Sequence, residues 1–178
     1  MLVTNSNDSS GADPDSIQLA APLDEYRDVV RPQWIDFNGH MNAGYYLVAF
    51  DDAISPWMAF VGLDAEHRSE ARVTTFSVEN HITYERELRE ATNIGVTTQL
   101  LAYDRKRIHA MQLMYNLDEG HLAATNEVMS LHISEDTRRV TEMHDTILTR
   151  LGHIWEAHRG LPIPDQVGSL MAVPGWQS

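Results

Sequence analysis

The sequence of 178 residues contains no cysteine and only 13 basic residues against 26 acidic ones. Without cysteine it can form neither a disulfide framework nor a zinc site built on thiolates. The net charge of −13 argues against a nucleic-acid partner, because binding phosphates needs clustered lysine and arginine. No apolar run is long enough to cross a bilayer, and the N-terminus lacks the basic start and apolar middle of a signal peptide. We therefore expect a cytoplasmic protein that works without a membrane.

Two common catalytic arrangements are also missing. The nine histidines include no His-x-x-x-His pair, and His153 and His158 are too far apart to share a helix face well. A metal site would therefore need distant ligands, and we expect none. No Gly-x-Ser-x-Gly stretch is present, so a serine nucleophile of that type is not supported.

The hydrophobic pattern predicts an α+β domain over residues 23–160, between a disordered N-terminal tail, 1–22, and a C-terminal tail, 161–178. The elements expected in this domain are a strand over 26–35, a helix over 43–62 broken near Ser55-Pro56, strands over 73–84, 92–103, 107–117 and 122–133, and a helix over 142–158. Successive strands joined by short turns form an antiparallel sheet. The long apolar helix must then cover one face of that sheet.

The stretch from Asp36 to Asn42 stands directly before this helix. Asn38-Gly39 favours a tight turn, and Asn42 is a preferred residue for capping a helix. The first N–H groups of a helix lack intrahelical partners and suit an anion or a developing oxyanion. The Asp36 carboxylate could activate water or attack an acyl group held there. The alternative is structural: Asp36 and Asn42 only cap a turn and a helix, while His40 packs or faces solvent.

Together with Tyr45-Tyr46 and Phe50-Asp51-Asp52-Ala53, this stretch resembles the hot-dog-fold acyl-CoA thioesterases of the 4-hydroxybenzoyl-CoA thioesterase type. Their pattern is roughly D-x-x-G-H-x-N-x-x-x-Y. The longer combination of residues 31–42, 78–84 and 104–109 is similar to betainyl-CoA thioesterases of bacterial carnitine degradation, which are sometimes fused to carnitine dehydrogenase.

The resemblance implies a fold, a reaction and an assembly. The fold is an antiparallel sheet of about five strands wrapped around a long central helix, with a further C-terminal helix. The reaction is hydrolysis of a small acyl-CoA thioester, betainyl-CoA first, with no cofactor because coenzyme A is part of the substrate. The assembly is a homodimer or homotetramer, with a functional link to a carnitine dehydrogenase. Pro56 departs from the unbroken helix expected of the family.

Carried over residue by residue, the resemblance assigns Asp36 as nucleophile or general base. It assigns the backbone N–H near Ala43 to the thioester carbonyl, and His40 and Asn42 to the shape of the loop. Glu79 and His81 become substrate-side residues, although neighbouring Glu and His on an exposed sheet face is the plainer explanation. Asp51 and Asp52 are candidates for a second carboxylate, against the plainer reading of exposed helix positions.

Two larger sets are candidates for holding the substrate. Aromatic faces bind trimethylammonium groups well, and the aromatic candidates, which could equally be core residues, are Trp34, Phe37, Tyr45, Tyr46, Trp57 and Phe76. The candidates for the CoA phosphates, which could equally be a solvated rim of charges, are Arg86, Arg89, Arg105, Lys106 and Arg107. Two other functions stay open: a thioesterase for another short acyl-CoA or acyl carrier protein, and a catalytically silent acyl-binding module.

Overall fold

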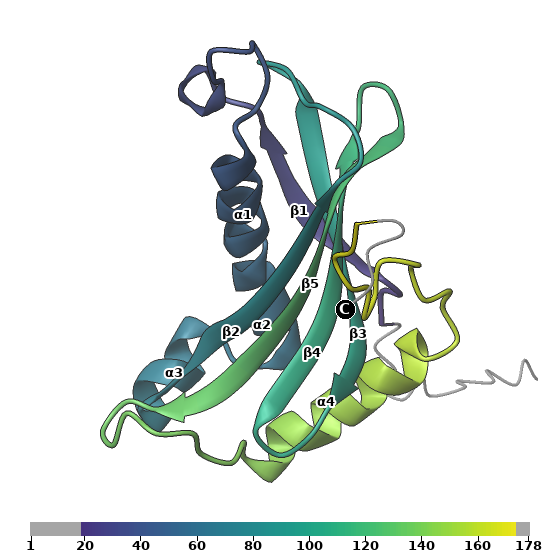
Figure 1. Ribbon diagram of the computed structural model, residues 1–178. Helices are drawn as coiled ribbons and strands as arrows, with labels where there is room; N and C mark the ends of the chain where they lie inside the picture. Colours follow the sequence, from purple (N-terminus) through teal and green to yellow (C-terminus); the bar gives the residue numbers. More distant parts are fainter. Residues whose placement is uncertain (1–18, 174–178) are drawn as a thin grey trace, which may run out of the picture.

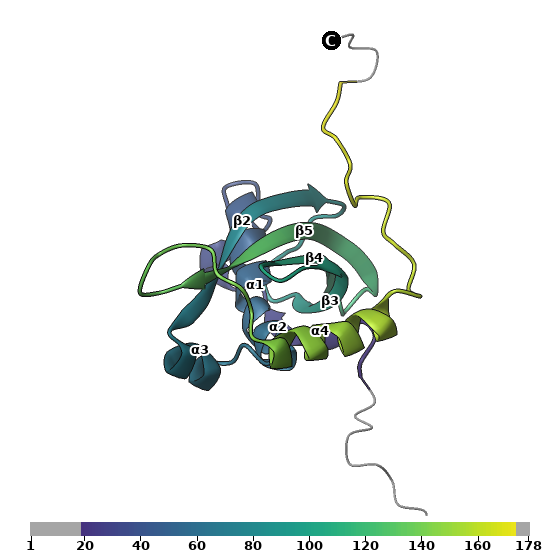
Figure 2. The same ribbon diagram turned by 90° about the horizontal axis from the view of Figure 1, so that it is seen from below.

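The computed structural model describes residues 19–173, which form one antiparallel sheet, four α-helices and one short 3-10 helix. The strands follow the order β1-β3-β4-β5-β2, so β1 and β2 are the two edges. Their bounds are Leu23–Val29 (β1), Val73–Tyr84 (β2), Asn93–Tyr103 (β3), Arg107–Asn116 (β4) and His121–Ser134 (β5). The sheet curls around the helices, as the view from below shows (Figures 1 and 2). This is the predicted α+β architecture, and β2 has the predicted bounds.

The central helix is broken, as predicted, but three residues before Pro56. Helix α1 spans Ala43–Asp52 and α2 spans Ile54–Val61, with Ala53 between them. Pro56 lies in the first turn of α2, where the missing N–H breaks no hydrogen bond and the fixed φ suits a helix. The other helices are α3, Ala65–Ala71, and α4, Asp145–His158, which begins three residues later than predicted.

The first predicted strand, 26–35, is wrong in its second half. β1 ends at Val29, and Pro32–Trp34 form a 3-10 helix, η1, with the proline at its first position. The proline explains the difference, because it has no N–H to donate to a strand ladder and its φ fits a helical turn. The tight turn leaves Trp34 buried at 2% exposure below the loop that follows.

Strand β2 contains an irregularity that changes which side chains share a face. A β-bulge lies between Ser77 and Glu79 in the pairing with β5, so the strand carries one extra residue there. Ile82 packs against the core, whereas Phe76 lies on the opposite face, under the Arg138 guanidinium at 5.1 Å. An unbroken alternation over residues 73–84 would place Phe76 and Ile82 on one face, but a bulge reverses the alternation of side chains beyond it, and the two residues lie on opposite faces.

Two hydrophobic clusters fill the curve of the sheet. The upper one surrounds α1 and includes Trp34, Tyr46 and Phe50. The lower one joins α2 to α4 through residues such as Trp57 and Leu151. The upper cluster supports the start of α1, where the predicted site lies.

Both predicted tails are partly described. Of residues 1–22, only 19–22 lie inside the described range, and the Ala20 carbonyl there accepts a hydrogen bond from His158 Nε2 at 2.9 Å. Residues 161–173 run over the outer face of the sheet, where the Gly168 N–H donates to Glu127 Oε2 at 2.7 Å. The described part of the C-terminal segment is therefore attached to the sheet.

Candidate active site at the start of α1

A tight turn holds Asp36 at the top of the molecule. The Asp36 N–H donates to the His40 carbonyl at 2.9 Å, and the Gly39 N–H donates to the Asp36 carbonyl at 3.0 Å. Gly39 has a φ of 81°, a conformation that glycine adopts without a steric penalty. Asp36 Oδ1 accepts from the Asn38 N–H at 2.8 Å. The half-buried Asp36 carboxylate is thus oriented by the turn while its second oxygen stays available.

The turn leads directly into the helix. The Asn42 N–H donates to the Trp34 carbonyl at 2.8 Å, which closes the loop, and Asn42 Oδ1 accepts from the Gly44 N–H at 3.0 Å. Asn42 is therefore the predicted N-cap. Within residues 19–173, the N–H of Ala43 has no acceptor among the hydrogen bonds of the structure. This free donor lies at the positive end of the α1 dipole, where developing negative charge is stabilised.

A segment far along the sequence braces this loop. The Met41 N–H donates to the Leu88 carbonyl at 2.8 Å, and His40 Nε2 lies 2.9 Å from Glu87 Oε1. The Tyr84 hydroxyl donates to the Ala43 carbonyl at 3.2 Å. Tyr84, Glu87 and Leu88 were not among the predicted site residues, because sequence alone does not show which distant segment meets a loop.

The family-model comparison identifies the family of the chain. The model of the thioesterase-like superfamily matches residues 30–151, which include this loop, α1 and most of the sheet. The chain belongs to this superfamily. The expected hot-dog fold and the expected thioester hydrolase activity are thereby confirmed.

Individual relatives agree with the superfamily match. A betainyl-CoA thioesterase of Pseudomonas aeruginosa is 37% identical over 156 residues, covering 88% of this chain and 98% of the relative. An L-carnitine dehydrogenase/betainyl-CoA thioesterase of Agrobacterium fabrum is 33% identical over 86% of this chain, but the match spans only 31% of that longer protein.

Solved structures give the same fold. The Staphylococcus aureus protein SAV2348, solved in complex with CoA, has a TM-score of 0.79 and 30% identity over 88% of this chain and 99% of its own. A putative thioesterase from Pseudomonas putida KT2440 has a TM-score of 0.75 and 31% identity over 87% of this chain and 99% of its own.

The predicted aromatic residues of this thioesterase do not form one cage within the chain. Trp34 and Tyr45 stack with ring centroids 5.8 Å apart, and the Arg31 guanidinium lies 4.6 Å from the Trp34 ring. Tyr46 is buried, meets Tyr84 edge to face at 5.1 Å and accepts the Leu88 N–H through its hydroxyl at 3.2 Å. Burial raises the pKa of Tyr46, so its hydroxyl stays protonated.

Three other aromatic candidates lie apart from these pairs. Phe37 is 96% exposed at the tip of the loop. Trp57 belongs to the lower cluster, in agreement with the alternative reading of a core residue, and Phe76 lies on the outer face of the sheet.

Glu79 and His81 lie on the outer face of the sheet, away from α1. They line a cavity of about 440 Å³ together with His109, Glu127 and the C-terminal segment 168–171. His109 Nε2 lies 2.8 Å from Glu127 Oε1. The two side chains do share one cavity, as their spacing allowed, but within one chain this cavity does not contain Asp36.

The basic candidates fall into two groups at opposite ends of the sheet. Arg86 and Arg89 lie on the segment that braces the Asp36 loop and line a cavity of about 480 Å³ with His121. Arg105, Lys106 and Arg107 lie at the β3–β4 turn, separated from the first group by the length of β3, about 33 Å at 3.3 Å per residue.

The second basic group is engaged with carboxylates. Arg105 Nε donates to Glu142 at 2.8 Å, and Arg107 lies 2.6 Å from Asp104. The hydrogen bond from Arg107 lowers the pKa of Asp104, so this pair stays charged at neutral pH.

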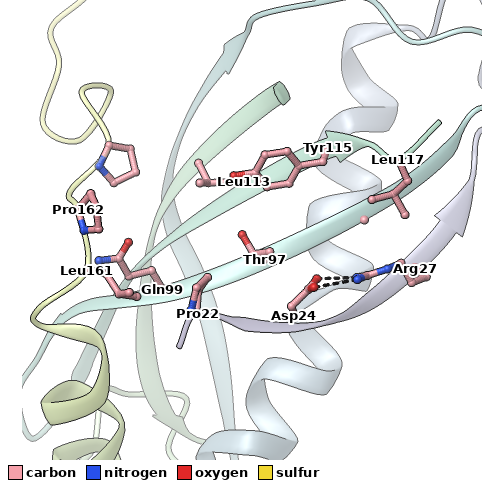
Figure 3. Close-up of a pocket in the computed structure, with 12 residues that line it drawn as sticks. Pro22, Asp24, Arg27, Thr97, Gln99, Leu113, Tyr115, Leu117, Leu161 and Pro162 are labelled. Atoms are coloured by element: carbon pink, nitrogen blue, oxygen red, sulfur yellow. Dashed lines mark hydrogen bonds and ion pairs between the residues drawn. The ribbon is translucent and has the colours of Figure 1, made fainter. Parts of the chain in front are cut away.

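Two further cavities of the thioesterase lie near the sheet and α1. One, of about 460 Å³, lies on the outer face between β3, β4 and the C-terminal segment, and it contains none of the predicted site residues (Figure 3). The other, of about 370 Å³, lies between α1 and β2, and Gly44 and Asp51 are among its lining residues. Asp52 lies on the other side of α1, where its charge acts on Tyr26.

Two more observations concern metal ligands and membrane-spanning helices. Among residues 19–173, no three His, Asp or Glu side chains are grouped so that they could hold a metal ion. No helix in the same range is long and apolar enough to cross a membrane.

Proposed function

We propose that this thioesterase hydrolyses betainyl-CoA to glycine betaine and CoA. The observation that carries the proposal is the 37% identity to the Pseudomonas aeruginosa betainyl-CoA thioesterase, because it extends over nearly the whole length of both chains. The geometry of the loop supports the chemistry. A carboxylate oriented by a tight turn lies in the loop that leads into a capped helix start with a free N–H.

In the proposed reaction, the thioester carbonyl oxygen binds at the Ala43 N–H. As the carbonyl is attacked, negative charge develops on this oxygen, and the N–H and the α1 dipole stabilise it. Asp36 either removes a proton from the attacking water or attacks the carbonyl itself, giving an anhydride that water then opens. In both routes the C–S bond breaks, CoA leaves as the thiolate and takes up a proton, and water supplies the carboxylate oxygen.

His40 and Asn42 position the site in this proposal. Asn42 holds the first turn of α1 in place through Gly44, and His40 ties the loop to Glu87. Neither side chain needs to touch the substrate for these roles.

The substitution Asp36→Asn tests the mechanism. Asparagine has nearly the same shape, and its Oδ1 can still accept from the Asn38 N–H, so the turn should be preserved. We expect kcat to fall by about 10²–10⁴-fold with little change in KM, because a base or nucleophile acts mainly in the transition state. Release of free CoA thiol gives the rate, and circular dichroism confirms folding. Unchanged activity in the variant would contradict this mechanism, whereas a wild-type protein that releases no CoA thiol would favour the silent acyl-binding module.

A panel of CoA esters tests the substrate. We expect betainyl-CoA to have a higher kcat/KM than acetyl-CoA or butyryl-CoA. Equal rates would indicate a thioesterase for another short acyl-CoA, and the same assay with acyl carrier protein thioesters separates the carrier. We expect no loss of activity with EDTA, because the proposed reaction uses no metal or other cofactor.

We propose that Arg86 and Arg89 bind the phosphates of CoA. They lie on the segment that braces the catalytic loop and line one cavity with His121, although Glu87 and Glu119 line it too and Arg89 lies 3.2 Å from Glu87 Oε1. Among residues 19–173, Arg86 has no carboxylate partner, so its positive charge is available to a phosphate. Arg105, Lys106 and Arg107 lie at the far end of the sheet in the same chain and pair with carboxylates. We expect Arg86→Ala to raise KM for the CoA ester, with Arg105→Ala as the control that leaves it unchanged.

We further propose a homodimer formed through the β2 edge. β2 is an edge strand of 12 residues, and apolar side chains that include Phe76, Val78 and Tyr84 are exposed along it. A long exposed apolar edge is a template for pairing with a second chain. Pairing there would also cover the open side of the cavity between α1 and β2.

The fused relatives support a metabolic setting. Their name joins L-carnitine dehydrogenase to betainyl-CoA thioesterase, and this chain spans about a third of their length. We propose that this protein serves the same sequence of reactions in the cytoplasm, where the charged CoA ester would be formed. Growth on carnitine with and without the gene, together with cell fractionation, tests this setting.

A further inference from the structure

The cavity between α1 and β2 has an apolar part and a polar part. Leu47, Val48 and Ile54 line it from the helices. The polar lining consists of Asp51 on α1, Ser77 and Asn80 on β2, and Asn126 on β5. Among the lining residues on the helices, Gly44 is the nearest to the start of α1, and it directly follows Ala43 with its free N–H. An acyl group bound at that N–H is therefore next to the lining of this cavity.

Asn126 has a buried acceptor with no partner. It is only 1% exposed, and its Oδ1 makes no hydrogen bond within the described part of the chain. Its Nδ2 donates to Gln112 Oε1 at 2.9 Å and to Asn80 Oδ1 at 3.2 Å. A buried acceptor left without a partner is unfavourable unless a bound group compensates it.

The hydrogen-bond network fixes the orientation of this amide. Gln112 Nε2 donates to the Phe50 carbonyl at 3.1 Å, so the atom that Gln112 turns toward Asn126 is its oxygen. The atom of Asn126 facing that oxygen must then be the donor, Nδ2. The free atom is therefore a carbonyl oxygen, which is electron-rich and attracts positive charge.

Asp51 adds a full negative charge to the same cavity. It lines the cavity wall, and among residues 19–173 no Lys, Arg or His nitrogen lies within 4.0 Å of its carboxylate. The lining of the cavity thus includes one carboxylate and no cation, and Asn126, whose buried Oδ1 has no partner among the described residues, belongs to the same lining.

We propose that this cavity is the acyl subsite and that Asp51 selects acyl groups carrying a quaternary ammonium. The inference rests on the proposed thioesterase function and specifies its substrate class. A trimethylammonium has no N–H and spreads its charge over methyl groups. Its surface therefore suits apolar walls combined with oxygen atoms, in this case Leu47, Val48 and Ile54 beside Asp51 and Asn126.

The helix geometry fits a short acyl group. Gly44 and Asp51 are seven residues apart, which is about 10 Å along the axis at 1.5 Å per residue. Helical side chains lean toward the N-terminus, so the carboxylate reaches back from Asp51 toward Gly44. An ammonium one methylene away from the carbonyl then lies between the oxyanion donor and the carboxylate.

The experiment compares two substrates of the same shape. In 3,3-dimethylbutanoyl-CoA a carbon replaces the nitrogen of betainyl-CoA, so the charge is removed and the volume is kept. For the wild-type protein we expect kcat/KM for betainyl-CoA to exceed that for the neutral ester at least about tenfold. In Asp51→Asn we expect this ratio to fall about tenfold, through loss on betainyl-CoA alone, with the rate on the neutral ester changed less than about twofold.

Asp52→Asn is the matched control. It removes a charge from the adjacent residue of the same helix end, on the side facing Tyr26, and should leave the ratio unchanged. Asp51→Glu should keep most of the preference, and thermal melting of all three variants checks their folding.

The outcomes separate this subsite from the function on which it rests. A wild-type protein that hydrolyses the neutral ester but not betainyl-CoA would overturn both. A wild-type preference for betainyl-CoA that persists in Asp51→Asn would overturn the subsite alone, and the exposed ring of Tyr84 would become the candidate. An equal loss on both esters in Asp51→Asn would show that Asp51 supports the fold and does not recognise charge.

Discussion

His158 is a single side chain that joins three parts of the molecule. It is fully buried at the end of α4. Its Nδ1 accepts from the Leu100 N–H on β3 at 2.9 Å, which leaves the proton on Nε2 for donation to the Ala20 carbonyl. Because both nitrogens are used in this way, the ring is required in its neutral form.

We expect this histidine to make stability depend on pH. Burial lowers the pKa of His158 in the folded protein below its ordinary value of 6.5. The unfolded chain therefore binds the proton more readily, and stability is favoured by higher pH. The contribution is complete above about pH 6.5 and is lost as the pH falls from there through the lowered pKa of the folded state. Urea unfolding at several pH values between 7.5 and 5 measures this slope.

The control for this prediction is His158→Gln, which does not titrate. Burial also lowers the pKa of His132, which remains in the variant and keeps part of the slope. The free energy of unfolding should therefore fall less steeply with decreasing pH in the variant than in the wild type. Parallel curves would show that His158 does not contribute.

At the scale of elements, the end of α2 depends on Gly62. Its φ of 93° lies in the left-handed region, and an added Cβ would come within 3.3 Å of Ile147 Cδ1 on α4. We expect Gly62→Ala to lower the free energy of unfolding by about 1–2 kcal/mol, because an L-residue is strained in that conformation. Gly160→Ala, just after α4, is the control: no atom lies within 4 Å of its added Cβ, so it should be nearly neutral. Equal effects at both positions would contradict this account. Urea denaturation measures both.

The sequence predicted the bounds of the strands well. It did not predict the bulge in β2 or the cause of the helix break, and each failure has a physical reason. Alternation and turn residues placed β2 to β5 within a residue or so, because each strand has one buried face. The bulge at Ser77–Glu79 could not be predicted, since one inserted residue leaves the alternating pattern looking intact. The break at Ala53 was attributed to Pro56, although a proline in the first turn of a helix breaks nothing.

In the candidate site, too, local features could be predicted from the sequence and contacts between distant segments could not. Asp36, Asn42 and the start of α1 could be predicted, because a turn, a cap and a helix start are local features. The contacts of Tyr84 and Leu88, and the partnerless oxygen of Asn126, come from segments that meet only after folding. Sequence also could not show that Arg86 and Arg105 lie at opposite ends of the sheet, because their distance depends on the folded arrangement of the strands.

At the scale of the whole molecule, a charge placed on one edge strand should affect the proposed dimer differently from the same charge on the other. Val78 on β2 is 53% exposed and Val29 on β1 is 42% exposed. We expect Val78→Lys to convert the proposed dimer into monomers, because charge on an edge strand opposes pairing. Size-exclusion chromatography with light scattering measures the mass. Val29→Lys places the same charge on the other edge and should leave the dimer intact, whereas loss of the dimer only in Val29→Lys would place the interface at β1.

The two hydrophobic clusters affect which amino-acid substitutions the protein can tolerate during evolution. The upper cluster supports the loop and α1, while the lower cluster holds α2 against α4. Substitutions far apart and without shared partners add nearly independently in their effect on stability. Stabilising changes in the lower cluster can therefore offset destabilising ones around α1. The break at Ala53 therefore separates the part of the core around α1, where substitutions would change the candidate site, from the part around α2 and α4, where substitutions would change stability.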